Sequence, residues 1–459
     1  MTLIENKHAS LERVLQHRLK SDKDAFLACL RHRNLESRKE ALGKTRVDND
    51  LAGESGLFTI TSRGIKPNNH VGIIKIKDIT ITILPKIFPE NSGTENTRAL
   101  LFMLQASGGI AAIKHVSLAG MDTTRGLLEI IAFLFAINLR AEIQRGILSD
   151  YVTIEENVPY LKGKLLVAQN AVVNMANKGR FYCEHDEFSI DTPLNRTILY
   201  AVHILRLAID YGKTRRVLEH IIQAFDGVDV HRPPSQGELD RVVFSRDATR
   251  FKPYFEVAKS IIRNSSPTLQ GGDLDFFSFM FNMPLLFERF ITNVFLIKAN
   301  TIFHGNSAKV TPKDSQYHLL LESDGQKSHR LEPDLIVTTE SRLYIIDLKY
   351  KVIEDEEGNK GCIARADAYQ MYAYAHRYYD EWSVAKDNVV VLVIYPKHIE
   401  NESEKKGVFR SYSIQGIQGV LIYLATVDLK VALEGVTGDR DFIDNISTQL
   451  AEIIKNVSP

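Results

Sequence analysis

The sequence predicts an α+β protein of several domains, with a β-rich N-terminal module, a helical middle region and a C-terminal α/β core. A chain of 459 residues is long enough for two or three domains. Short alternating apolar segments gather near the N-terminus, helical spacing dominates the middle, and strands and helices then follow one another to the C-terminus. We expect the three regions at 1–95, 96–245 and 246–459.

The composition is that of an ordinary globular protein, because 44% of the residues are hydrophobic and 25% are charged. The formal net charge is zero, so a contact with DNA would depend on local basic patches such as 213–216 and 404–410. The longest apolar run, at 127–139, is interrupted by Glu129 and is too short for a membrane span. The N-terminus has no signal-peptide pattern, and three scattered cysteines have no metal spacing. We therefore expect a cytoplasmic protein that has no membrane contact.

The N-terminal module begins with a predicted amphipathic helix at 9–41 and continues in strands. Alternating segments that are separated by Gly, Pro and Asn occur at 56–65, 70–78 and 79–87.

The middle region is predicted to be helical. Candidate helices lie near 97–106, 124–145, 164–178, 193–211 and 213–225. Thr192 is placed to cap the fourth of them, and Pro193 suits its first turn. Capping and pairing with Arg196 account for the nearby acids, so we interpret them as scaffolding (Asp186, Glu187 and Asp191). Cys183 and His185 lack the partners that a zinc site needs. A break at 231–240 predicts a linker.

The last region is predicted to form one sheet covered by helices. Helical segments at 284–299 and 363–380 flank strands at 331–339, 342–349 and 388–395.

Charged residues interrupt two of these strands. Residues two apart on a strand face the same side, so Ile345, Asp347 and Lys349 share one face. If the preceding strand is a neighbour, Asp334 and Asp347 can converge on one cation with Lys349 beside them. Two carboxylates of this kind hold Mg²⁺, and the ion activates a water molecule for phosphodiester hydrolysis. The alternative is a same-face ion pair, which contributes little.

Two helices carry further polar residues. Glu288 interrupts the apolar stripe of 284–299 and is either paired with a cation or a third metal ligand. Gln370 and Tyr374 lie four apart on one face of the helix at 363–380, where ordinary packing on the sheet is the alternative.

The order of these residues resembles the PD-(D/E)xK nuclease superfamily, and its RecB-like branch in particular. The segments "HVGIIKIKDITITILPKI", "EIQRGILSDY", "LKGKLLVAQN", "CEHDEFSIDTPLNRTI", "FERF", "LEPDLIV", "DLKYK" and "YQMYAYA" occur in the order typical of the McrC family. The resemblance spans about 55–400, whereas 405–459 match nothing.

The resemblance implies a restriction-endonuclease-like core that cleaves double-stranded DNA with one or two Mg²⁺ ions, for which Mn²⁺ can substitute. It gives Asp334 and Asp347 as metal ligands, Lys349 as the catalytic lysine and Glu288 as a further acidic ligand. Gln370 and Tyr374 would support the site and contact DNA. The implied partner is an McrB-like AAA+ GTPase ring, which binds the GTP and is bound and stimulated by this subunit through its N-terminal part. The chain itself has no GxxxxGK[ST] loop.

A polar loop in the N-terminal module is a candidate for reaching the partner's phosphates, although a solvated hairpin loop is the simpler interpretation (Arg63, Lys66, Asn68 and Asn69). Two other functions remain open: a non-catalytic activator of the AAA+ partner, and a stand-alone RecB-like repair nuclease. The intact acids and lysine speak against the first, and the β-rich N-terminus speaks against the second. Dependence on DNA methylation stays open.

Overall fold

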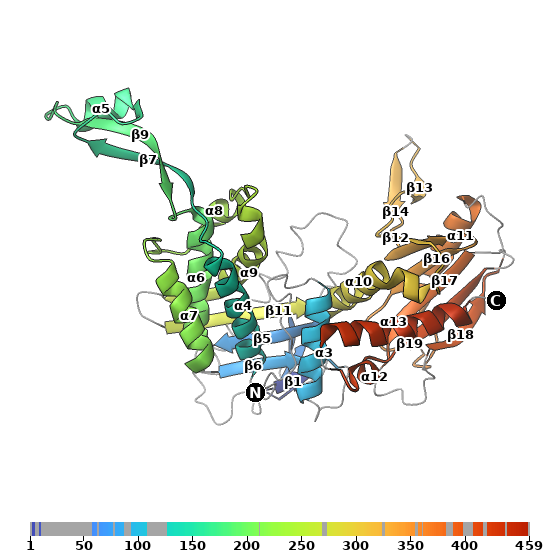
Figure 1. The fold of residues 1–459 in the computed structure, drawn as a ribbon. Coiled ribbons are helices and arrows are strands. Elements are labelled where there is room, and N and C mark those ends of the chain that lie inside the picture. The colour runs from blue at the N-terminus through green and yellow to red at the C-terminus, as the bar shows by residue number, and fades with distance from the viewer. Residues whose placement is uncertain are drawn as a thin grey trace.

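The computed structural model is a mixed α/β protein of several regions (Figure 1). The residues that it describes are 2–4, 9–10, 57–61, 64–76, 79–86, 93–107, 126–210, 212–268, 273–323, 326–353, 357–359, 361–381, 389–397, 407–415, 420–436 and 438–457. The predicted helix at 9–41 falls outside this part of the chain, except that residues 9 and 10 form a short strand.

The central sheet joins strands that lie far apart in the sequence. Its order is β1-β6-β5-β11-β10, and its strands are β1 (Thr2–Ile4), β5 (His70–Ile76), β6 (Ile79–Leu84), β10 (Ser265–Thr268) and β11 (Asp273–Asn282). A smaller sheet has the order β2-β4-β3 and consists of β2 (Ala9–Ser10), β3 (Phe58–Thr61) and β4 (Gly64–Pro67). The predicted N-terminal strands are therefore confirmed. The expected boundary at 246 does not separate this sheet, because β10 and β11 lie beyond it.

The approach of β5 to β11 requires a glycine. Gly72 has a φ of 139°, and a Cβ atom there would lie 2.1 Å from the carbonyl oxygen of Phe279. Any larger residue would push the two strands apart and remove their pairing.

Helices pack on this sheet, and the helical region continues beyond it on one side (Figure 1). They are α3 (Gly93–Ala106), α4 (Leu127–Gln144), α6 (Pro193–Ala208), α7 (Gly212–Ala224), α8 (Gln236–Asp240), the 3-10 turn η3 (Ala248–Phe251) and α9 (Lys252–Arg263). The Thr192 side chain caps α6 as predicted, because its oxygen accepts a hydrogen bond from the amide of Asn195 at 3.2 Å. The expected linker at 231–240 contains the short helix α8.

A long β-ribbon projects from the helical region, which we call the arm (residues 150–189; Figure 1). It contains β7 (Asp150–Val158), β8 (Lys164–Leu165), α5 (Val167–Val173) and β9 (Phe181–Ser189). The sequence predicted one helix at 164–178, but only seven of those residues are helical. Helical spacing misled here because α5 buries no residue. Side-chain amides of Asn157, Asn170 and Asn174 hydrogen-bond one another at 2.7–3.0 Å and join α5 to β7.

The C-terminal region is a six-stranded mixed sheet of order β12-β15-β16-β17-β19-β18. Its strands are β12 (Ala308–Pro312), β15 (Leu335–Thr339), β16 (Leu343–Leu348), β17 (Val389–Pro396), β18 (Gly407–Ser413) and β19 (Leu421–Val427). The hairpin of β13 (His318–Leu321) and β14 (Lys327–Arg330) extends from it. Its helices are α10 (Met283–Ile302), α11 (Arg365–Glu381), α12 (Leu429–Leu433) and α13 (Asp439–Asn456).

The described residues within 405–459, a segment that the sequence left without a place, complete this region. Strands β18 and β19 form its far edge, and α13 packs along α10 and α3. Apolar side chains on the two faces of the sheet belong to different cores. Tyr344, Ile346 and Leu348 pack into the core that contains α10 and α13. Ile345 packs with Met371 and Tyr374 of α11 on the other face.

None of the helices in the described ranges combines the length and the apolar character that a membrane crossing requires.

Candidate active site

Two aspartates meet at the end of the β15–β16 pair. These strands are antiparallel, with Leu335 opposite Ile346, so the next pair in register is Asp334 and Asp347. Asp347 is 1% exposed and continues the face of Ile345, which α11 covers. Asp334 lies just before β15, and its Oδ2 accepts a hydrogen bond from the amide of Leu348 at 2.7 Å. The two acids therefore lie at the ends of neighbouring strands, as the prediction requires, and their convergence on one cation stays a prediction.

Lys349 connects these acids to helix α11. Its Nζ lies 2.9 Å from Asp347 Oδ2 and donates to Gln370 Oε1 at 2.9 Å. Gln370 Nε2 in turn donates to the hydroxyl of Tyr374 at 2.8 Å. Gln370 and Tyr374 thus reach the strand residues because α11 lies on the face that Asp347 shares. These contacts link four of the six predicted site residues, namely Asp347, Lys349, Gln370 and Tyr374.

Glu288 approaches from the other side of the sheet. Its helix α10 packs on the opposite face, where the neighbouring Phe287 ring lies 5.9 Å from that of Tyr350. The Glu288 side chain is only 7% exposed, and its Oε1 lies 3.2 Å from Nζ of Lys313. The sequence allowed Glu288 to be either paired with a cation or a metal ligand, and in the structure it is paired with Lys313. A ligand role for Glu288 stays a prediction.

Burial is the main influence on the pKa values of the cluster, and neighbouring charges act beside it. Burial, followed by the charges of Asp347 and Glu288, raises the pKa of Asp334 well above its ordinary value. Burial likewise raises the pKa of Asp347, although the Lys349 ammonium opposes the shift. Burial by itself would lower the pKa of Lys349, but the charge of Asp347 and the contact with it raise that pKa overall. Lys349 is therefore an ammonium ion in this arrangement.

Sequence reasoning missed three charged neighbours of the site. Lys313 pairs with Glu288, and Lys351 pairs with Asp367, a buried acid in the first turn of α11. The charge of Asp367 adds to the rise in the pKa of Asp347. A signal for the second pair was present, because Lys351 follows Lys349 at strand spacing and Asp367 precedes Gln370 by three residues.

The donor set of Asp334 and Asp347 fits Mg²⁺, which prefers carboxylate oxygens and takes only one or two of them from the protein. Burial is the main cause of the raised pKa values of both aspartates, and nearby carboxylates add to it, so a cation at this position would favour their ionised forms. Within the described ranges no group of three or more His, Cys, Asp or Glu side chains is placed to hold a metal ion. Glu288 would have to leave Lys313 before it could become a third carboxylate ligand.

The other residues that the sequence singled out have structural roles. Asn68 is 8% exposed and accepts a hydrogen bond from Thr59, and the carbonyl of Asn69 accepts from the amide of Met283. These two residues form the turn between β4 and β5, in which Asn69 is exposed, so a contact of this turn with the partner stays a prediction; Arg63 lies outside the described residues. Lys213 lies over the ring of Phe133. In 404–410, Arg410 contacts Cys362.

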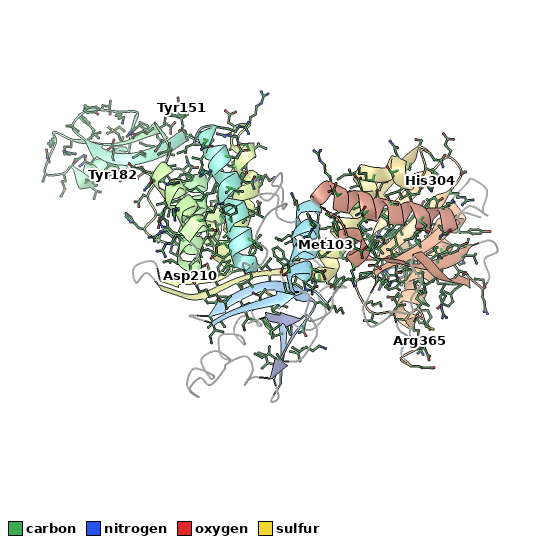
Figure 2. The ribbon with its side chains drawn as sticks, turned by 60° about the horizontal axis from the view of Figure 1, so that its bottom comes forward. Met103, Tyr151, Tyr182, Asp210, His304 and Arg365 are labelled. Atoms are coloured by element: carbon green, nitrogen blue, oxygen red, sulfur yellow. The ribbon has the colours of Figure 1, made fainter. Side chains whose placement is uncertain are left out.

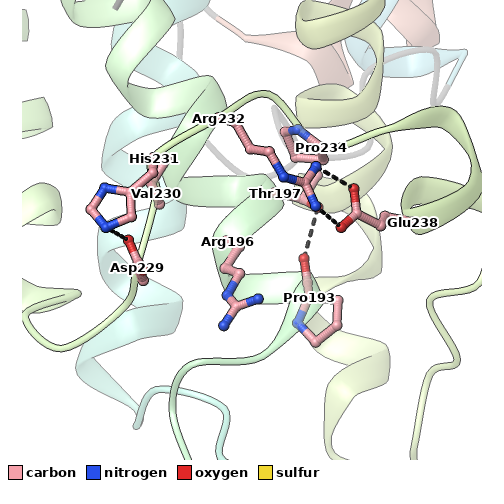
Figure 3. A pocket seen from close by; sticks show the side chains of 9 residues that line it. All are labelled: Pro193, Arg196, Thr197, Asp229, Val230, His231, Arg232, Pro234 and Glu238. Carbon is pink, nitrogen blue, oxygen red and sulfur yellow. Dashed lines mark hydrogen bonds and ion pairs between the residues drawn. The ribbon is translucent and has the colours of Figure 1, made fainter. Parts of the chain in front are cut away.

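A cavity of about 280 Å³ lies at the foot of the arm, away from the acidic cluster (Figure 3). Its charged side chains are engaged with one another. Arg232 forms two hydrogen bonds to Glu238 at 2.6 and 2.9 Å, and His231 pairs with Asp229 at 2.8 Å. Arg196, at its wall, binds Asp191 through two contacts of 2.6 Å, as expected for scaffolding. In the arm, buried His185 pairs with Glu156.

Known proteins place this fold and sequence in a family. The model of the McrBC 5-methylcytosine restriction system component matches residues 65–407. The "Type IV methyl-directed restriction enzyme EcoKMcrBC" of Escherichia coli (strain K12) is 25% identical over 348 residues, which are 72% of this chain and 92% of that protein. A chain of the refined half-complex from the tetradecameric assembly of Thermococcus gammatolerans McrB AAA+ hexamers with bound McrC has the same fold. Its TM-score is 0.67 at 21% identity, and the match covers 98% of this chain and 99% of that one. Since the family model covers most of the sequence, the chain belongs to the McrBC 5-methylcytosine restriction system component family.

Proposed function

We propose that this chain is the nuclease subunit of an McrBC-type restriction system and hydrolyses phosphodiester bonds of double-stranded DNA with Mg²⁺. The observation that carries the proposal is the convergence of Asp334, Asp347 and Lys349 at one end of a buried strand pair. Buried acids beside aliphatic side chains are costly unless a cation compensates them. The mixed sheet with these three residues at its end supports a PD-(D/E)xK nuclease core.

The chain's own groups have distinct tasks in this chemistry. Asp334 and Asp347 would hold the Mg²⁺, for which Mn²⁺ can substitute; when bound, the ion supplies a water of lowered pKa and neutralises charge on the phosphate. Lys349 is an ammonium ion and therefore acts by stabilising negative charge in the transition state rather than by taking a proton. It is held at the acids by Asp347 and by the amide oxygen of Gln370.

Gln370 and Tyr374 orient Lys349. Gln370 can accept a hydrogen bond from Lys349 only when its amide oxygen points toward Lys349 and its amide nitrogen points away. The Tyr374 hydroxyl favours this orientation, because it accepts a hydrogen bond from that nitrogen. Tyr374 is 3% exposed, so it acts through Gln370, whereas Gln370 is close enough to the surface to contact DNA.

The partner that we propose is an McrB-like AAA+ ring, which binds and hydrolyses GTP. The family supports this partner, and so does the solved assembly of Thermococcus gammatolerans, whose title names McrB AAA+ hexamers with bound McrC. We infer that the arm, rather than the N-terminal part that the family resemblance implies, is the docking surface. Eight of the sixteen large apolar side chains that are exposed in the described residues lie on it: Tyr151, Tyr160, Leu161, Val167, Val172, Val173, Met175 and Phe188. Exposed apolar groups at this density mark a protein-binding surface.

The test uses full-length wild-type protein, Asp347→Asn, and the arm variant Phe188→Ser, each with an McrB-like AAA+ protein, GTP, Mg²⁺ and methylated or unmethylated duplex DNA. We expect Asp347→Asn to lose cleavage by at least about 100-fold while its stimulation of GTP hydrolysis is retained. Phe188→Ser should instead lose stimulation and partner affinity by about 10-fold or more. Equal cleavage by wild type and Asp347→Asn would refute the site. If the wild-type protein cleaves DNA when neither the partner nor GTP is added, the protein is a stand-alone nuclease.

A further inference from the structure

Lys313 is fixed by its backbone to the strand that carries Asp334. It follows β12, the edge strand that pairs with β15, and Pro312 lies opposite Leu335. The Lys313 amide donates a hydrogen bond to the carbonyl of Asp334 at 3.0 Å. Lys313 has a φ of 47°, a left-handed conformation that is unfavourable for a residue with a side chain. The loop thus holds the Lys313 backbone against the acidic cluster despite that cost.

The Lys313 side chain spans from solvent to a buried acid. Its Nζ lies 3.2 Å from Oε1 of Glu288. The Glu288 side chain is 7% exposed, whereas that of Lys313 is 53% exposed. By contrast, the Lys349 side chain is 24% exposed and is held by two groups. Lys313 is therefore the more exposed of the two ammonium groups, and its side chain can turn toward solvent.

The net formal charge of the cluster would change sign if a divalent cation entered. Three carboxylates (Asp334, Asp347 and Glu288) face two ammonium groups (Lys349 and Lys313), which leaves one negative charge. An ion of charge +2 makes the sum positive by one. The ion and the Lys313 ammonium would then compete for the same Glu288 oxygens, because both need that carboxylate as a ligand or counter-ion.

We propose that Lys313 is an exchangeable counter-ion of the active site, which pairs with Glu288 in the metal-free protein and turns to a DNA backbone phosphate when a divalent cation takes Glu288. A lysine suits this role because its compact charge sits on a long flexible stem. A phosphate contact there would position the duplex without reading its sequence. Ion binding and DNA binding are coupled through this one side chain. The inference deepens the proposed nuclease function and rests on it.

The test compares full-length wild type with Lys313→Ala and Lys313→Arg, with Lys309→Ala as the matched control. Lys309 lies on the same strand and is exposed. Calorimetric titration with Ca²⁺ or Mg²⁺ measures ion affinity without cleavage, and a 30-base-pair duplex in Ca²⁺ measures DNA affinity over a range of salt concentrations. Lys313→Ala should bind the ion about 3- to 10-fold more tightly, because a competing cation is gone. It should bind the duplex more weakly, with a salt slope smaller by about 0.9. Lys313→Arg should keep the DNA affinity, and Lys309→Ala should keep both.

Opposite changes in ion and DNA affinity are the signature of exchange. If Lys313→Ala behaves like Lys309→Ala in both titrations, Lys313 is an ordinary surface lysine and the inference fails. If Lys313→Ala binds the ion more weakly, Lys313 supports the loop structurally, and the inference also fails. Either result leaves the proposed nuclease function intact as long as wild type binds the ion and cleaves DNA. A wild type that binds no divalent cation would overturn both.

Discussion

Replacing Asp334 by asparagine should make the metal-free protein more stable while it removes Mg²⁺-dependent cleavage. The ionised Asp334 side chain is unfavourable in the metal-free fold, because burial and the charges of Asp347 and Glu288 all raise its pKa. An asparagine removes the charge and keeps an oxygen that can accept the hydrogen bond from the Leu348 amide. The site would thus be relieved of repulsion without losing its backbone contact.

The sign of the effect follows from the link between pKa and free energy. A raised pKa means that the fold disfavours the ionised form, so Asp334→Asn should raise the free energy of unfolding, by about 1 kcal/mol, which is the usual size of a single-residue effect. Asp334→Ala relieves the same charge but leaves the Leu348 amide without its acceptor, which costs about 1–3 kcal/mol. Asp334→Asn should therefore exceed Asp334→Ala in stability by that difference.

The assay is unfolding in denaturant, with EDTA and then with Mg²⁺. Mg²⁺ at 100 times its dissociation constant should stabilise wild type by about 2.7 kcal/mol and should leave Asp334→Asn unchanged. Glu340→Gln is the control, because this exposed acid lies between the same two strands and loses the same charge. The reasoning is refuted if Asp334→Asn is less stable than wild type in EDTA, or if Mg²⁺ stabilises both proteins equally.

Three further outcomes follow from single contacts. Tyr374→Phe removes the acceptor of the Gln370 amide and should lower cleavage by about 10-fold, measured as a fall in kcat with little change in DNA affinity. Lys351→Ala leaves the buried Asp367 carboxylate without its cation and should cost about 1–3 kcal/mol in denaturant unfolding, a loss that a second change, Asp367→Asn, should largely restore. Gly72→Ala should lower the free energy of unfolding by more than about 2 kcal/mol, since its Cβ would overlap the opposite strand, whereas Gly237→Ala, which has open space, should be neutral or slightly stabilising.

The sequence predicted the strand pair and its acids because their pattern is local. Alternation fixed the faces of β16, and the resemblance to a nuclease motif connected Asp334 with Asp347 before any coordinates were known. The Thr192 cap was predictable for the same reason, since capping depends on neighbours along the chain. In each of these cases the decisive residues lie within a few positions of one another or on consecutive strands.

The features that escaped prediction depend on contacts between distant segments. Lys313 reaches Glu288 only because β12 pairs with β15, and the sequence of β12 alone does not indicate which strand it pairs with. The pairing of β11 with β5 joins segments about 200 residues apart, which periodicity cannot reveal. The segment 164–178 of the arm was predicted as one helix, although only Val167–Val173 is helical, because an exposed element has no buried face from which its period could be inferred.

The arm and the acidic cluster lie at opposite ends of the molecule, and this separation bears on how cleavage is controlled. Figure 2 shows Tyr151 and Tyr182 on the arm, far from His304 and Arg365 of the C-terminal region. A partner that holds the arm therefore cannot contribute a side chain to the site from that contact. Its influence would have to pass through the body of the protein or through the DNA that it delivers. The central sheet, α10 and α13 share one apolar core, so the body connects the two ends by continuous packing. Delivery of DNA to the site is the simpler route, because Asp347, Lys349, Gln370 and Tyr374 already contact one another.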